Sequence, residues 1–83
     1  MYIPSPKELA FLVIAKRKQL GLTQTQVADL IGLKQKSISA FENKPENTRL
    51  ETLFRILTAL NLDIKVTDKE AATKNKKVWK QEW

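Results

Sequence analysis

The chain has 83 residues with no Cys and no His, and its 15 Lys and Arg against 9 Asp and Glu give a formal net charge of +6. A single core of this size buries only about 60–65% of the surface that the unfolded chain exposes, which argues against a deep catalytic cleft. The missing Cys and His exclude disulfides, thiolate or imidazole catalysis and the usual structural zinc sites, while the positive charge favours an anionic partner such as nucleic acid.

The longest apolar run, Leu9 to Ala15, is much shorter than the ~20 residues that cross a bilayer. Lys16, Arg17 and Lys18 follow it directly, where a secretory signal would have a small-residue cleavage site. The sequence therefore predicts a cytoplasmic protein without a membrane span. We expect no enzymatic activity, no small-molecule substrate, and no cofactor or metal.

A first helix is predicted to begin at Pro6. Ser5 and Glu8 form an S-x-x-E capping box, and the proline stands at the first helical position. Apolar residues then recur at helical steps until Gly21, which supplies a left-handed stop. Arg17 lies on the same apolar face, and a charge in that position needs a partner.

Two shorter helices are predicted next. Thr23 and Gln26 form a second capping box, and the helix that follows ends at Gly32. The next helix runs from about Lys34 to Asn43, with its large apolar residues on one side and polar residues on the other. Two short helices joined by a glycine turn, the second with a polar outer face, are typical of a helix-turn-helix.

The polar face of this third helix suits DNA. Gln35 and Lys36 occupy its leading end, where amide and ammonium groups can reach base edges in a major groove about 12 Å wide. Between Lys16 and Lys36 the only acidic residue is Asp29, among several Lys and Arg. This concentrates positive charge beside the predicted reading surface.

A fourth helix and then a strand are predicted after a turn at Pro45. Thr48 and Glu51 form a third capping box, and an amphipathic stripe follows it to Leu60. From Leu62 to Thr67 the apolar period changes to two, which predicts a strand with a single apolar face. A lone strand has no pairing partner in its own chain, so we expect it to pair across a homodimer, through Leu62, Ile64 and Val66.

The predicted domain covers residues 1–67, and residues 68–83 form a basic tail that is poor in aliphatic residues and expected to be disordered. Trp79 and Trp83 are its large aromatic residues. Because aromatic side chains are favoured anchors at interfaces, we interpret Trp83 as a partner anchor.

The segment TQTQVADLIGLKQKSISAFEN resembles the DNA-binding core of the lambda-repressor and Cro type, the XRE family, and the resemblance covers roughly residues 6–62. It implies an all-α, lambda-repressor-like domain of about four helices that binds operator DNA, here with the short strand added. It also implies that Gln24 holds a phosphate and braces Gln35, and that Arg17 and Glu42 form a buried ion pair. The DNA-binding set predicted on this basis is Gln24, Lys34, Gln35, Lys36, Ser37, Ser39 and Asn43.

The segment IGLKQKSISAFENKPENT, the strand in place of a fifth helix and the pair Glu82–Trp83 resemble the HipB-type antitoxins, which partner HipA-type Ser/Thr kinase toxins. The resemblance implies a two-stranded lid across the dimer, repression of the dimer's own operon and docking of Trp83 on the toxin. Two alternatives stay open. A stand-alone phage-type or host regulator would differ only in the tail, and an interaction module that has lost DNA binding would show little salt-sensitive affinity.

Overall fold

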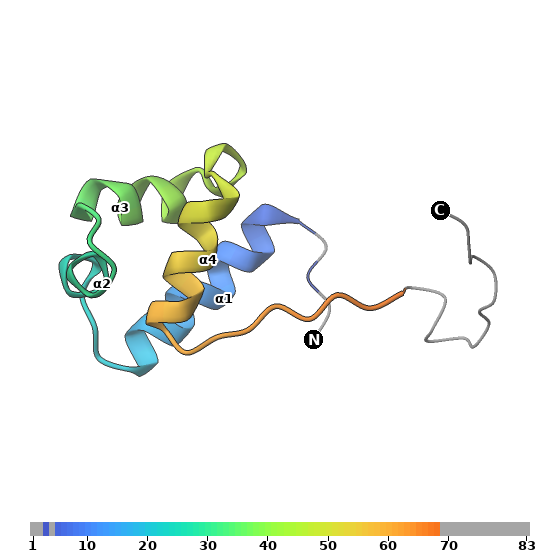
Figure 1. Cartoon of the computed structure of the whole chain (residues 1–83), viewed down its shortest axis with the longest axis horizontal. Coiled ribbons are helices and arrows are strands. Elements are labelled where there is room, and N and C mark those ends of the chain that lie inside the picture. The colour runs from blue at the N-terminus through green and yellow to red at the C-terminus, as the bar shows by residue number, and fades with distance from the viewer. Residues whose placement is uncertain (1–2, 4, 69–83) are drawn as a thin grey trace.

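The computed structural model describes residue 3 and residues 5–68, and these form an all-helical domain followed by an extended segment (Figure 1). At one end of the molecule α2 and α3 lie together, α1 and α4 cross in the middle, and the segment after α4 leaves toward the other end. No helix in this described part is long and apolar enough to span a bilayer. The helical elements are α1 (Pro6–Gln19), α2 (Gln24–Leu30), α3 (Gln35–Asn43), the 3-10 helix η1 (Pro45–Asn47) and α4 (Leu50–Ala59).

The first two helices begin at the predicted caps. The Ser5 hydroxyl accepts a hydrogen bond from the Glu8 backbone N–H (3.2 Å), and proline occupies the first turn of α1. At α2 the capping box is reciprocal, because Thr23 Oγ1 accepts from the Gln26 N–H (3.1 Å) while Gln26 Oε1 accepts from the Thr23 N–H (2.8 Å). These bonds satisfy amides that a helix end leaves without partners, so the sequence fixes where both helices start.

The third predicted cap is wrong. Arg49 is the N-cap residue of α4, and no side-chain hydrogen bond forms there. The reason lies in η1, whose closing turn uses the Thr48 backbone N–H as a donor to the Pro45 carbonyl (3.1 Å). Thr48 therefore ends the preceding turn, and α4 begins two residues later at Leu50.

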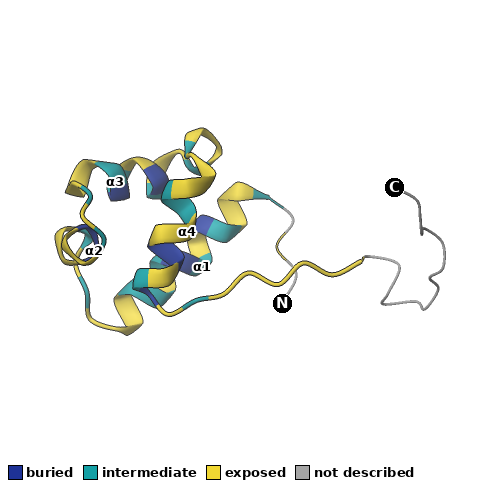
Figure 2. Ribbon diagram, viewed as in Figure 1, coloured by how far each residue is buried: buried dark blue, intermediate teal, exposed yellow. Residues whose placement is uncertain are grey.

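One hydrophobic core joins all four α-helices (Figure 2). Phe41 is its largest fully buried side chain, and α4 contributes through its C-terminal half. Leu50 and Phe54, both on the apolar stripe predicted from the sequence, are instead 69% and 52% exposed, because the first half of α4 lies at the rim of the core. The buried residues are Ala10, Val13, Val27, Ala28, Ile38, Phe41, Ile56, Leu57 and Leu60.

The turn between α2 and α3 depends on Gly32, whose φ of +69° lies in the left-handed region. The Leu33 N–H closes the end of α2 by donating to the Ala28 carbonyl (2.9 Å). Glycine adopts this backbone conformation without the steric cost that a Cβ brings. The turn therefore sets the angle at which α3 leaves α2.

The strand predicted for Leu62–Thr67 does not form in the single chain: residues 62–68 are extended, and the described residues contain no strand. A β-ladder needs a second strand, and the helical domain offers none. Leu62 still packs on the core, and its N–H donates to the Leu57 carbonyl (2.8 Å). Ile64 and Val66 are 46% and 90% exposed. Apart from Asp68, the predicted tail, with Trp83, lies outside the described residues.

Candidate DNA-binding surface

Helix α3 is held by one side and leaves the other side free. Ile38 and Phe41 are each 1% exposed and pack into the core. The leading residues Gln35 and Lys36 are exposed, and Ser39, one turn further on, is half-buried. In Figure 2 the exposed residues of α3 lie on the outer side of the domain. The polar face is therefore presented by a rigid apolar base.

A nearly buried ion pair fastens α3 to α1. Arg17 Nε lies 2.7 Å from Glu42 Oε2, and Arg17 Nη2 donates to Glu42 Oε1 at 3.2 Å, so the contact is bidentate. Only 11% of the Arg17 side chain and 7% of the Glu42 side chain are exposed. Arg17 Nη1 also donates to the Leu22 carbonyl (2.9 Å) in the loop between α1 and α2. The guanidinium thus holds three parts of the chain together.

Two glutamines extend this pair to the surface. Gln24 Nε2 donates to Glu42 Oε1 (2.8 Å), and Gln35 Nε2 donates to Gln24 Oε1 (2.6 Å). Gln24 is half-buried and Gln35 is exposed. The first residue of α2 and the first residue of α3 are therefore joined to each other and to the ion pair, and we call these four side chains the Arg17–Gln35 relay.

The remaining predicted site residues lie along α3. Ser39 and Asn43 are brought together, with Asn43 Nδ2 donating to Ser39 Oγ (3.2 Å). Lys34, at the N-cap of α3, and Lys36 are exposed, while Ser37 is half-buried. No hydrogen bond or ion pair joins these last three side chains to another residue in the described part of the chain. Their ammonium and hydroxyl groups are available to a ligand.

A shallow hollow of about 560 Å³ separates the loop after α1 from the leading end of α3. The Lys18 ammonium and the Thr23 and Thr25 hydroxyls give it a positive, polar lining of the kind that contacts phosphate oxygens. Among the described residues there is no cluster of His, Cys, Asp or Glu that could hold a metal ion. The hollow is lined by Arg17, Lys18, Gly21, Leu22, Thr23, Gln24, Thr25 and Gln35.

Sequence reasoning missed the Leu22 carbonyl, the bond from Gln24 to Glu42 and the part that Lys18 and Thr25 take in the hollow. One signal for the first was available. Arginine carries five N–H donors, and a single carboxylate accepts only some of them when the group is nearly buried. A further acceptor near Arg17 was therefore to be expected, and the turn that follows α1 supplies it.

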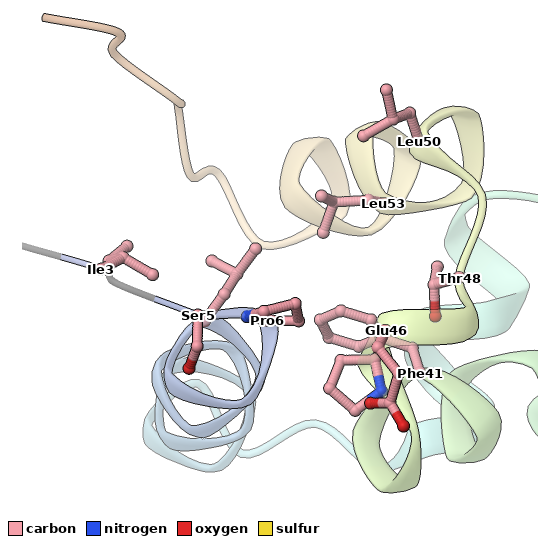
Figure 3. Close-up of a pocket in the computed structure, with 10 residues that line it drawn as sticks. Ile3, Ser5, Pro6, Phe41, Glu46, Thr48, Leu50 and Leu53 are labelled. Carbon is pink, nitrogen blue, oxygen red and sulfur yellow. The ribbon is translucent and has the colours of Figure 1, made fainter.

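A separate hollow lies between the start of α1, η1 and α4, and has a volume of about 370 Å³ (Figure 3). Its walls are mostly apolar, and they include none of the predicted DNA-binding residues. It is lined by Ile3, Ser5, Pro6, Leu9, Phe41, Pro45, Glu46, Thr48, Leu50 and Leu53.

Comparison with known proteins places this geometry in a family. The helix-turn-helix model HTH_3 matches residues 13–66. The chain is 43% identical over 82 residues to Antitoxin HipB of Escherichia coli K12, a match that covers 98% of this chain and 93% of that protein. It is 35% identical over 60 residues to Antitoxin HigA1 of Mycobacterium tuberculosis H37Rv, covering 72% of this chain and 40% of that protein.

Solved structures agree with the sequence comparison. The chain superposes on a chain of a HipA-HipB-O2-O3 complex with a TM-score of 0.80 and 45% identity, covering 83% of this chain and 97% of that chain. A HipB-O4 20mer complex gives the same TM-score of 0.80, also at 45% identity and with coverage of 83% and 97%.

Proposed function

The chain belongs to the HTH_3 helix-turn-helix family and is a HipB-type antitoxin of the XRE kind, and from this premise we propose that it represses its own operon and sequesters a HipA-type kinase toxin. Relatives at this level of identity have been solved with operator DNA and with HipA. We assign the chain no catalytic step of its own. A repressor acts where the operator lies, so we place it in the cytoplasm.

The observation that carries the DNA-binding proposal is the Gln35 amide, exposed at the leading end of α3 and held there by Gln24. In a major groove this position puts Gln35 and Lys36 against base edges, and Ser39 one turn deeper along the same face. Phosphate contacts would come from Gln24 and Asn43, on either side of these residues, with Lys34 and Ser37 completing the interface.

The homodimer in this proposal uses the apolar side of the segment after α4. A groove of about 550 Å³ runs along this segment, with Ile3, Leu9 and Leu12 on its opposite wall. Ile64 and Val66 expose apolar side chains that the single chain does not cover. Pairing of this strand with that of a second copy would cover them and set two α3 helices in successive major grooves, about 34 Å apart.

A salt titration tests the DNA-binding part. The probe is the duplex upstream of the chain's own coding sequence, compared with a shuffled duplex of equal composition. Because phosphate neutralisation releases counterions, we expect log K for either duplex to fall with log salt by about 0.9 per phosphate contact, with tighter binding of the upstream duplex. A flat salt response, or equal affinity for both duplexes, would contradict sequence-specific binding.

Removal of Trp83 tests the toxin part. Because Trp83 lies in the tail rather than in the helical domain, its deletion should leave operator affinity unchanged while weakening co-purification with a co-expressed HipA-type kinase. Deleting Trp79 is the matched control, as an aromatic residue of the same tail. If the kinase is captured equally well without Trp83, that residue is not the anchor; if the full-length chain captures no kinase, the chain acts as a stand-alone regulator.

A further inference from the structure

The Arg17–Gln35 relay connects a side chain that cannot touch DNA to one that can. Glu42 is 7% exposed, and its two carboxylate oxygens are occupied by Arg17 and Gln24. Gln35, at the other end, is exposed, and no hydrogen bond joins its Oε1 to the described part of the chain. A change at the buried end can therefore reach a base only through the two glutamine amides.

The carboxylate dictates which way each amide faces. A carboxylate held in an ion pair has acceptors and no donor, so the Gln24 atom that meets Glu42 must be its NH₂ group. The Oε1 of Gln24 then points the other way, and it accepts a hydrogen bond from the NH₂ group of Gln35. The Gln35 Oε1 and its second N–H are left for the groove. Amide direction, free to reverse at most surface glutamines, is fixed here from the core outward.

From this geometry we infer that Glu42 and Gln24 are positioning residues that set operator preference at the base pair read by Gln35. The inference deepens the DNA-binding function proposed above and rests on it. An amide that presents an acceptor and a donor in fixed order matches adenine, which offers the N6 amino donor beside the N7 acceptor. A glutamine free to rotate could instead offer only its acceptor or only its donor, and so would tolerate other bases. The relay converts a nearly buried charge into base selectivity.

Three variants separate this role from a structural one. Gln24→Met keeps the side-chain length and the Arg17–Glu42 pair but removes both amide bonds. Glu42→Gln keeps the shape of the side chain and removes the charge that orders the amides. Glu51→Gln is the matched control, since it makes the same chemical change in the exposed Glu51–Arg55 pair, which takes no part in the relay.

The probe is a pool of duplexes randomised over about two helical turns, from which each variant selects its preferred sequences. Gln35→Ala identifies the position that Gln35 reads, as the position where preference is lost. We expect Gln24→Met and Glu42→Gln to lower base preference at that position about tenfold and to leave the other positions unchanged. Glu51→Gln should select the wild-type motif. A variant that is partly unfolded binds all duplexes less but ranks them as before, so relative preference reports positioning and not stability.

Wild-type preference at the Gln35 position in either Gln24→Met or Glu42→Gln would overturn the inference, because the relay passes through both residues. Preference lost evenly at every position would overturn it as well, since that is the effect of general loosening. If the wild-type protein selects no motif, both the proposed DNA-binding function and the inference fail. If it selects a motif that only Gln35→Ala disturbs, the function stands and the relay does not.

Discussion

At the scale of single residues, the Arg17–Glu42 pair combines stability with position. Each charge loses most of its water, and the loss is offset only because bidentate contacts and the Leu22 carbonyl satisfy the guanidinium. The pair spans α1 and α3, so it fixes the helix that carries the polar face relative to the helix that starts the fold.

Breaking this pair should be costly. We expect Arg17→Met to lower the free energy of unfolding by about 3 kcal/mol, near the lower end for buried pairs, because Glu42 would be left nearly buried without its cation. Urea denaturation with a common slope measures the loss. Arg55→Met is the control, since it breaks an exposed pair at 3.5 Å and should cost less than about 1 kcal/mol. Equal losses would show that the buried position confers no extra stability.

Residue identity and spacing were enough to predict that pair, but not all of its neighbours. Arg17 and Glu42 both fall on packing faces, and the family resemblance paired them. The bond from Gln24 to Glu42 depends on which of several rotamers the glutamine adopts, and that choice is made by tertiary contacts between α2 and α3. The sequence pattern contains no information about it.

At the scale of elements, local chemistry decided most boundaries. The caps at Ser5 and Thr23 and the stops at Gly21 and Gly32 act within a few residues, so they could be predicted from the sequence. The cap at Thr48 failed because two local signals competed, and the turn that starts at Pro45 took the backbone N–H of Thr48. The strand after Leu60 could not appear, because its pairing partner is not part of this chain.

Gly32 provides the test at this scale. Its φ is +69°, and a Cβ built there meets nothing within 4 Å, so the cost of a side chain is conformational and not steric crowding. We expect Gly32→Ala to lower the free energy of unfolding by about 1–2 kcal/mol, and Gly32→Asn to lower it less, because asparagine tolerates the left-handed region. Thermal denaturation of the two variants gives the comparison. Equal stability of alanine variant and wild type would mean that the turn does not need glycine.

At the scale of the whole molecule, the exposed apolar side chains are concentrated where a second copy is proposed to bind. Ile3, Ile64 and Val66 are 40%, 46% and 90% exposed, and all three line the groove beside the segment after α4. Water contact with this much apolar surface is unfavourable, and a two-stranded lid formed with a second copy would remove it. Unpaired backbone groups of the same segment would be satisfied by the same step.

Val66→Asn tests this arrangement without touching the core. Because Val66 is almost fully exposed in the single chain, the variant should keep its helical content and its monomer stability. Two valines, one from each copy, would lose about 1.5 kcal/mol of burial each, so self-association measured by sedimentation equilibrium should weaken about 100-fold.

Thr67→Asn is the control for this experiment, because position 67 lies on the opposite face of the predicted strand and its substitution should leave the dimer intact. Affinity for a duplex with two half-sites should fall with the dimer in Val66→Asn, while affinity for a single half-site should not change, because the polar face of α3 is untouched. If Val66→Asn sediments like the wild-type protein, then this face of the segment does not form the dimer, and the spacing between the two reading helices must be set by another surface.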